Sequence, residues 1–211
     1  MKIRILGEDL ELLTEKALIW NRKSILIFSD VHLGKAESFQ ALGVPVPSGV
    51  NLNDLQRIAG LIQKHSITEV LILGDLIHHK SSWSEDLFLT IKDFLTFFSQ
   101  VKFKLLIGNH ERGSLGYLEA LPIELINGDC DIHPFTFTHG HESSTKPFAI
   151  QGHVHPVVIL REGPVSLRLP CFVLDEKNLI LPSFGSFTGG FEINLKPKTR
   201  IFAVTKKIIE L

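Results

Sequence analysis

Residues that can bind metal follow several apolar runs of the sequence, each at the point where the run ends. Asp30 and His32 follow the run Ser24–Phe28, and Asp75 follows the run Val70–Leu73. The other members of this set, after the runs at 103–107, 135–138 and 148–151, are Asn109, His139, His153 and His155. Imidazole and carboxylate together favour Mn²⁺, Fe²⁺, Zn²⁺ or Co²⁺ over Ca²⁺ or Mg²⁺ alone, and a neutral amide suits a second, more open metal. Two such metals would clamp a phosphate group and activate a hydroxide for attack on phosphorus.

The strands and helices that must position these residues are predicted from hydrophobic periodicity. Apolar residues at helical spacing predict helices over Asn53–Lys64 and Ser84–Phe98, and Asn51 or Asn53 is expected to cap the first. These helices alternate with three buried strands at 24–28, 70–73 and 103–107, an order that predicts crossover connections and a parallel sheet. Because ligands collect at the carboxyl edge of open α/β sheets, we expect the metal-binding set to meet there.

Short β-like runs dominate the second half of the chain, among them Val165–Leu169 and Phe172–Leu174 as separate strands. A chain that starts as α/β and finishes with β-meanders predicts two packed sheets with helices outside. The glycines expected to let the backbone turn sharply at the strand ends are Gly74, Gly108 and Gly152.

Length and composition predict one ordinary globular domain over residues 1–211. The 211 residues are 44% hydrophobic and 21% charged, which allows a substantial core. The formal net charge of −1 gives no global basic field to attract nucleic acid, although bound cations would add positive charge. Cys130 and Cys171 stand in no metal-like or redox-like spacing, which predicts free thiols in a reducing compartment. With no signal peptide or transmembrane run, we expect a cytoplasmic protein without membrane contact.

Five short motifs resemble those of the calcineurin-like metallophosphoesterase superfamily. D-x-H stands at 30–32, G-D at 74–75, G-N-H-E at 108–111, H-G-H at 139–141 and G-H-x-H at 152–155, in the family's order. Taken singly, Asp30 and Asp75 would be interpreted as helix caps or turn acids, so the specificity lies in the complete set. The resemblance implies an α/β fold in which two packed mixed β-sheets are flanked by helices, as an α/β/β/α sandwich.

The resemblance also implies a role for each motif residue. It assigns Asp30, His32 and His155 to one metal, Asn109, His139 and His153 to the other, and Asp75 to a bridging position. His110 resembles the family's catalytic histidine, which stabilises the phosphorane-like transition state or protonates the leaving oxygen. Glu111 stands where Asp is commoner in the family, and we expect its carboxylate to hold His110.

Four further residues near the motifs are candidates for contact with substrate phosphate or with the ligands. Arg112 can bind phosphate bidentately through its guanidinium, and Lys35 is either a phosphate contact or a solvated lysine. His78 lies three positions after Asp75, and His141 is either a turn histidine near the metals or a phosphate contact.

For two other parts of the sequence, a functional and a purely structural role are both possible. Phe184–Gly190 is either a substrate-facing loop or a tight turn that packs its phenylalanines. A group of basic residues is either a DNA track or a solvated edge, and its members are Lys196, Lys198, Arg200, Lys206 and Lys207.

A closer resemblance links the chain to the bacterial ligase-associated DNA damage response endonucleases. It rests on S-D-V-H-L-G-K-A-E at 29–37, G-V-P-V-P at 43–47, G-D-L-I-H at 74–78 and F-G-S-F-T-G-G at 184–190. It implies a DNA endonuclease of DNA repair that favours Mn²⁺ and has a DNA ligase and a helicase as pathway partners. The alternative is a phosphodiesterase or phosphatase for cyclic nucleotides or other small phosphoesters, which the nearly neutral charge favours. A non-catalytic binding module is disfavoured because every motif residue is present.

Overall fold

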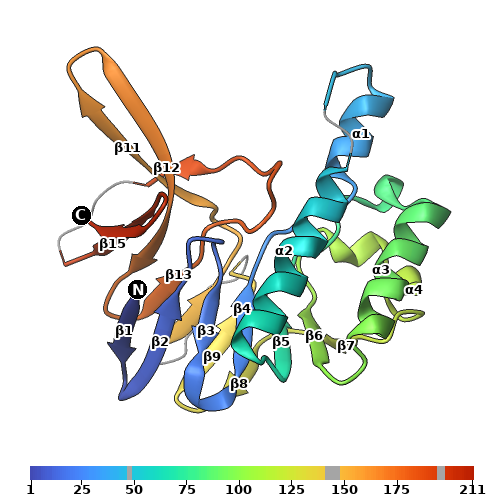
Figure 1. Cartoon of the computed structure of the whole chain (residues 1–211), viewed down its shortest axis with the longest axis horizontal. Helices are drawn as coiled ribbons and strands as arrows, with labels where there is room; N and C mark the ends of the chain where they lie inside the picture. The colour runs from blue at the N-terminus through green and yellow to red at the C-terminus, as the bar shows by residue number, and fades with distance from the viewer. Residues whose placement is uncertain (47–48, 141–147, 194–197) are drawn as a thin grey trace.

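The computed structural model of the chain describes residues 1–46, 49–140, 148–193 and 198–211. Its strands form two mixed sheets that pack against each other, with helices over one outer face (Figure 1). The two packed mixed sheets expected from the sequence are therefore confirmed. The α-helices are α1 (Lys35–Ala41), α2 (Val50–His65), α3 (Glu85–Phe97) and α4 (Leu115–Leu118), and the short 3₁₀ helices are η1 (Asn21–Lys23), η2 (Lys80–Ser82) and η3 (Glu111–Gly113).

The first sheet contains the parallel strands that the alternating pattern predicts. Its order is β1 (Lys2–Ile5), β2 (Glu8–Leu12), β3 (Leu18–Trp20), β4 (Ile25–Phe28), β5 (Glu69–Ile72), β6 (Lys102–Leu106) and β7 (Glu124–Ile126). Strands β1 to β4 pair antiparallel, whereas β4 to β7 pair parallel. The carboxyl ends of β4, β5 and β6 therefore lie at one edge of the sheet.

The second sheet is built from the short β runs of the second half of the chain. Its order is β14 (Phe191–Glu192), β11 (Pro156–Glu162), β12 (Val165–Leu174), β13 (Asn178–Ile180), β10 (Ala149–Gln151), β9 (Phe135–Thr138) and β8 (Cys130–Ile132). Two more strands, β15 (Arg200–Val204) and β16 (Ile208–Glu210), extend it from β12. The prediction of two separate strands at 165–169 and 172–174 is wrong, because β12 continues through Pro170 as a single strand.

The α-helices in the described residues all precede residue 119, and none covers the outer face of the second sheet. In the described residues, the chain beyond α4 forms short strands and turns. A small apolar cluster that includes Cys171, Val173 and Ala203 occupies that side instead. Both cysteines are free, as predicted, and Cys171 is buried.

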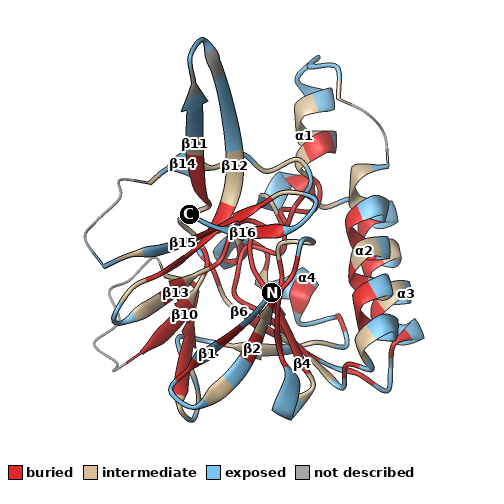
Figure 2. Cartoon of the chain, turned by 60° about the vertical axis from the view of Figure 1, so that its left-hand side comes forward, coloured by how far each residue is buried: buried red, intermediate tan, exposed pale blue. Residues whose placement is uncertain are grey.

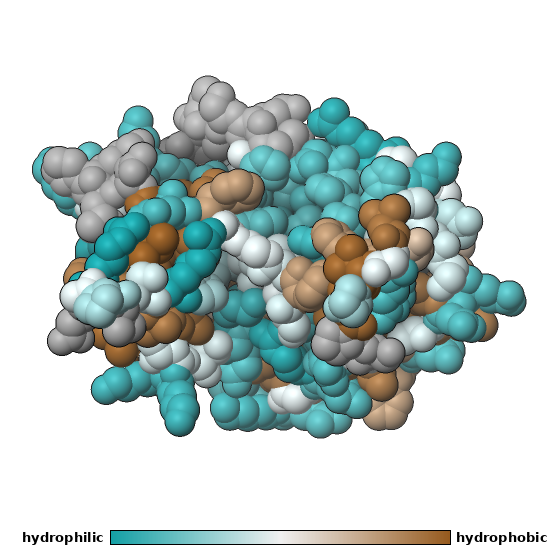
Figure 3. Space-filling view, turned by 90° about the horizontal axis from the view of Figure 1, so that it is seen from above, coloured by the Kyte–Doolittle hydropathy of each residue, from teal (hydrophilic) through white to brown (hydrophobic). Residues whose placement is uncertain are grey.

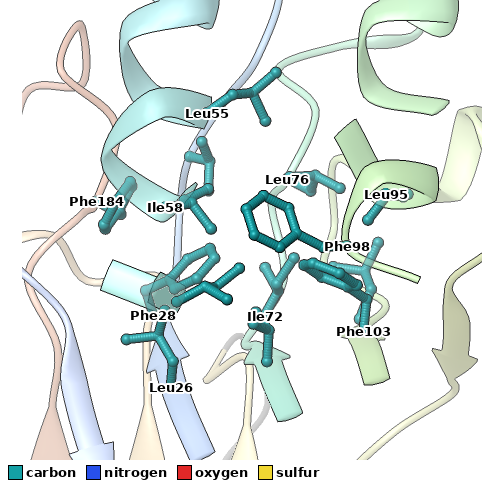
Figure 4. Close-up of a cluster of buried hydrophobic side chains, with 14 of the residues drawn as sticks. Leu26, Phe28, Leu55, Ile58, Ile72, Leu76, Leu95, Phe98, Phe103 and Phe184 are labelled. Carbon is teal, nitrogen blue, oxygen red and sulfur yellow. The ribbon is translucent and has the colours of Figure 1, made fainter. Parts of the chain in front are cut away.

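Apolar side chains on both faces of the central strands make two separate cores. Leu26, Phe28 and Ile72 face α2 and α3, where they meet residues such as Ile58 and Phe98 (Figure 4). The opposite face packs on the second sheet, and its members include Ile27, Leu71, Leu106, Phe137, Ile150 and Phe172. Burial on both faces explains why these strands read as continuous apolar runs, and Figure 2 shows the buried strands inside the molecule.

The predicted helices over 53–64 and 84–98 are confirmed as α2 and α3, but α2 begins differently. Gly49 caps α2, and the Asn51 side chain instead accepts a hydrogen bond from the backbone of Gly34 at 2.9 Å. Ser84 caps α3 by accepting from the backbone of Leu87 at 3.1 Å. Among the residues described, no helix is long and apolar enough to cross a membrane.

Candidate metal centre

The seven predicted metal ligands meet where strands of the two sheets end. The first sheet places Asp30 and His32 after β4, Asp75 after β5 and Asn109 after β6. The second sheet supplies the rest, His139 after β9 with His153 and His155 after β10. In Figure 1 this edge lies between two projections, the β11–β12 hairpin and α1. Viewed from above, a mostly hydrophilic band lies between hydrophobic groups over these two projections (Figure 3).

One group of three ligands consists of Asp30, His32 and His155. Each offers a ligand atom within 4.8 Å of the others, and His155 Nε2 lies 3.0 Å from Asp30 Oδ1. Asp30 is fully buried, and His32 is 6% exposed. These are the residues that the family resemblance assigns to one metal.

A second group of three consists of Asp75, His139 and His153. Its ligand atoms also lie within 4.8 Å of one another, and His153 Nδ1 is 3.1 Å from His139 Nε2. Asn109 joins this group, since its Oδ1 lies 3.0 Å from His139 Nε2. The resemblance assigns the same residues to the other metal.

Asp75 lies between the two groups. Its Oδ2 is 3.4 Å from His139 Nε2 and 4.0 Å from His32 Nε2, so one carboxylate oxygen faces both sides. The backbone N–H of His153 donates to Asp30 Oδ2 at 2.9 Å and ties the second sheet to the first. The geometry therefore suits Asp75 for a bridging position.

Unpaired polar atoms show that this cluster fits bound cations. The buried atoms His32 Nδ1 and Nε2 have no hydrogen-bond partner among the described residues, and Asp30 Oδ1 and His155 Nε2 face each other at 3.0 Å without forming a hydrogen bond. Buried polar atoms are nearly always paired, so these atoms in one cluster indicate that a ligand completes it. Burial lowers the pKa of His32 to about 3, which keeps its imidazole neutral and able to donate a lone pair.

Charge in the second group also favours cation binding. Burial raises the pKa of the Asp75 carboxyl, but the hydrogen bond and charge of His139, with the charges of His110 and His32, together outweigh burial and lower this pKa to about 2. Burial likewise lowers the pKa of His139, but the Asp75 carboxylate, with the Asp30 charge and the Leu73 carbonyl oxygen, outweighs burial and raises that pKa to about 9. A metal bound at His139 Nε2 would replace the proton there.

Five of the seven predicted ligands have a strained backbone. The residues with positive φ include Asp30 at 59°, His32 at 54°, Asp75 at 52°, His153 at 65° and His155 at 49°. Such angles are uncommon outside glycine and cluster at functional sites. The predicted role of the preceding glycines holds only for Gly74, whose φ is 85°. At Gly152 the reason is space, because a Cβ there would overlap Ser29 Oγ.

His110 is oriented by the main chain. Its Nδ1 donates a hydrogen bond to the carbonyl oxygen of His78, and its backbone N–H donates to Asp75 Oδ1 at 3.2 Å. Its Nε2 then lies 3.7 Å from Asp75 Oδ2 and points to the cluster. The His78 ring stacks on His110 with a centroid separation of 5.6 Å, and burial lowers the pKa of His78 to about 4.

Glu111 does not hold His110, which corrects the expectation from the sequence. Its fully buried carboxylate accepts backbone hydrogen bonds from Gly108 at 2.9 Å, Asp75 at 3.0 Å and Ile77 at 3.2 Å. It therefore fixes the loops that carry Asp75 and Asn109. Burial and the nearby Asp75 carboxylate raise the pKa of Glu111 to about 7.

The remaining candidates lie at different distances from the cluster. Lys35 begins α1 and is half-buried, and burial lowers its pKa. Arg112 is exposed in η3 and, with His139, lines a cavity of about 320 Å³. His141 and Lys196 lie outside the described residues. Lys198, Arg200, Lys206 and Lys207 are all exposed.

The segment Phe184–Gly190 packs against the end of β4. Phe184 is fully buried, and its ring lies 4.7 Å from that of Phe28. Sequence reasoning missed Leu73, whose carbonyl oxygen accepts from His139 Nδ1 at 2.7 Å. A main-chain carbonyl leaves no mark on residue type, so no signal in the sequence could have indicated it.

The family model for calcineurin-like phosphoesterases matches residues 23–177. The chain belongs to this family. The resemblance described from the sequence is thus confirmed, and the chain is a metal-dependent phosphoesterase with the dinuclear type of site that the family uses.

Comparison with solved structures finds a nuclease of similar length. The crystal structure of the nuclease MPE from Pseudomonas putida has a TM-score of 0.86 and 32% identity, covering 100% of this chain and 99% of that one. YfcE, a phosphoesterase from E. coli, has a TM-score of 0.46 and 15% identity, covering 89% of this chain and 97% of that one. No curated protein matches the sequence.

Proposed function

We propose that this calcineurin-like phosphoesterase is a Mn²⁺-favouring DNA endonuclease that acts in DNA repair. The observation that carries the proposal is the likeness to a nuclease along the whole chain, at 32% identity. The position of the cluster supports it, since the strand ends lie between two projections, the β11–β12 hairpin and α1 (Figure 1). We also propose a DNA ligase and a helicase as pathway partners, and the cytoplasmic location stays a prediction.

The proposed ligand set follows the two groups of side chains. Asp30, His32 and His155 would hold one divalent cation, and Asp75 would bridge to the second. Asn109, His139 and His153 would complete that second position. Both sites combine carboxylate and imidazole donors, and the second adds the Asn109 amide, a mixture that suits Mn²⁺ and also accepts Zn²⁺, Fe²⁺ or Co²⁺.

The proposed chemistry is hydrolysis of a phosphodiester without a covalent enzyme intermediate. When bound, the two cations would neutralise phosphoryl oxygens and supply a hydroxide nucleophile at neutral pH. His110 Nε2 faces the same space, because Nδ1 is committed to the His78 carbonyl oxygen. The imidazole can therefore stabilise charge on phosphorus-bound oxygen or give a proton to the leaving oxygen.

Three neighbouring side chains are proposed to contact substrate or its surroundings. Arg112 lines the cavity beside His139 and can meet a phosphate with its planar guanidinium. Lys35 and His78 lie on the other side of the cluster, where the Lys35 charge lowers the pKa of His78 further. We propose Lys35 and Arg112 as phosphate contacts and His78 as the support of His110.

Covalently closed circular DNA tests the proposal directly, because a circle has no end for an exonuclease to use. Single-stranded and duplex circles are incubated with the protein and Mn²⁺, beside the His110→Ala variant. Opening of circles that is lost in the variant is the expected result. Intact circles, with a small chromogenic phosphodiester still hydrolysed, would overturn the DNA assignment and leave a small phosphoester as substrate.

A further inference from the structure

The segment Phe184–Ser186 forms a support beneath the end of β4. The backbone N–H of Phe184 donates to the carbonyl oxygen of Ser29 at 2.8 Å, and that of Gly185 donates to the carbonyl oxygen of Asp30 at 3.1 Å. The approach leaves no room for a side chain, since a Cβ on Gly185 would overlap the carbonyl oxygen of Val31. The backbone of Asp30, which has a left-handed φ of 59°, is thus held in place by hydrogen bonds from this segment.

An ion pair on α2 holds the same segment from its other side. Asp54 is 2% exposed, and its carboxylate accepts from the backbone N–H of Ser186 at 2.9 Å and from the Ser186 hydroxyl. Arg57 Nη1 lies 2.7 Å from Asp54 Oδ1 and donates to the carbonyl oxygen of Phe184 at 3.1 Å. The Arg57 guanidinium also lies 4.1 Å from the centre of the Phe184 ring.

The rest of the Arg57 fork and a buried lysine complete the support. Arg57 Nη2 donates to the carbonyl oxygen of Glu15 at 2.6 Å, and Lys16 Nζ donates to that of Gly185 at 3.0 Å. Burial and the Arg57 charge lower the pKa of Lys16 to about 8. Two cations and one carboxylate are therefore placed around three residues of backbone, each with a hydrogen-bond partner.

Such an arrangement is an inefficient way to stabilise a fold, because desolvation of buried charge offsets most of the attraction. A guanidinium that donates to four separate acceptors instead fixes the relative positions of those acceptors. The acceptors here belong to α2, to residue 15 and to the Phe184–Ser186 segment, which is hydrogen-bonded to the backbone of Asp30. Partners behind a metal ligand set its orientation and change metal affinity when they are removed.

We propose that Asp54 and Arg57 are positioning residues that hold Asp30 through the Phe184–Ser186 segment and thereby set the affinity of the metal site. The inference rests on the proposed role of Asp30 as a metal ligand. It extends that role to residues of α2 that belong to none of the five motifs.

The test measures Mn²⁺ binding to the metal-free full chain by calorimetric titration. Arg57→Lys keeps the charge but loses the fork, and Ser186→Ala removes one hydroxyl from an exposed position. We expect Arg57→Lys to weaken one of the two Mn²⁺ sites about tenfold, and Ser186→Ala to weaken the same site by less. The matched control is Arg22→Lys, because Arg22 also pairs with a carboxylate, and its Nη2 and Nε donate to Glu8 at 2.6 and 2.9 Å. It should bind Mn²⁺ as the wild type does.

Unchanged Mn²⁺ affinity in both Arg57→Lys and Ser186→Ala, with a lower urea midpoint, would overturn the positioning role and leave a structural ion pair. Circular dichroism checks that the variants are folded, and Ser186→Ala remains informative if Arg57→Lys is not. Asp30→Ala separates this inference from the proposed ligand set. If only Asp30→Ala loses one Mn²⁺, Asp30 remains a proposed metal ligand and the positioning role of Asp54 and Arg57 is rejected.

Discussion

The chemistry of single residues in this site depends on which ring nitrogen of each histidine faces the cluster. His110 and His139 both donate from Nδ1 to a main-chain carbonyl oxygen, that of His78 and that of Leu73. Each Nε2 is thereby directed toward Asp75, at 3.7 and 3.4 Å from Oδ2. A carbonyl partner fixes the tautomer and the ring orientation together.

Replacement of His110 by alanine tests its assignment at this scale. We expect turnover to fall by roughly 10²–10⁴-fold, the usual worth of a general acid. Bound Mn²⁺ should be unchanged in His110→Ala and reduced in Asp75→Asn, because only the second residue is a proposed ligand. The control is His65→Gln, in the last turn of α2. A His110→Ala variant that hydrolyses a phosphodiester at the wild-type rate would refute the catalytic role.

Glu111 is expected to matter for stability more than for the reaction. Its replacement by alanine leaves three buried backbone N–H groups without their acceptor. We expect the free energy of unfolding to fall by about 3 kcal/mol or more, measured by urea denaturation. Glu119→Ala, at an exposed position, is the control. A change within about 0.5 kcal/mol for Glu111→Ala would contradict the loop-fixing role.

At the scale of strands and helices, the proposed ligands lie where buried strands stop, and five of them have left-handed backbone angles. Gly152 precedes two of these ligands and lies against Ser29 and Asp30 without room for a Cβ. We expect Gly152→Ala to weaken Mn²⁺ binding and to destabilise the fold by about 1–3 kcal/mol. Metal titration and urea denaturation measure the two effects.

Gly60→Ala is the matched control for Gly152→Ala. Gly60 lies inside α2, is exposed, and has no atom within 4 Å of an added Cβ. Alanine there should stabilise the helix by up to about 1 kcal/mol and leave metal binding unchanged. Equal effects of the two substitutions would mean that close packing at Gly152 has no special role.

How much of the fold could be predicted depended on burial. Strands β4 and β6 were predicted because they are runs of buried apolar residues, and helices α2 and α3 because their apolar residues repeat at helical spacing. Helix α1 was not, because Ala36 is its only buried residue and gives no period. The edge strands β7 and β8 were not predicted either, because they are half-exposed and have no run of buried apolar residues.

The same contrast holds within the site. The seven proposed ligands were predicted because each is a chemically distinctive residue after an apolar run, and His110 was predicted from the family resemblance. The partners of Glu111 and the support from Arg57 were not, since both depend on backbone atoms brought together only by the fold. The left-handed angles at Asp30 and His153 were likewise unpredictable, because neither residue type requires them.

At the scale of the whole molecule, the metal centre joins the two sheets. Asp30, Asp75 and Asn109 follow strands of the first sheet, whereas His139 and His153 follow strands of the second. Metal binding should therefore stabilise the packing of one sheet on the other. The stabilisation by ligand grows with concentration and reaches about 2.7 kcal/mol per site at 100 times the dissociation constant.

Thermal unfolding with and without metal tests this coupling. We expect the midpoint to rise steadily with Mn²⁺ concentration and to fall to its lowest value in a chelator. Asp75→Asn, which lacks the proposed bridging carboxylate, should show a much smaller rise. A midpoint that is the same in chelator and in excess Mn²⁺ would show that the centre does not couple the two sheets.

The measurement that tests the two-metal account most directly is the rate of phosphodiester hydrolysis against the number of Mn²⁺ ions bound per chain. Metal-free protein is titrated with Mn²⁺, free ion is followed by electron paramagnetic resonance, and a chromogenic phosphodiester reports the rate. The account predicts two ions per chain at saturation and a rate that rises as the second ion binds. Full hydrolysis with one ion bound, or in the presence of chelator, would contradict it.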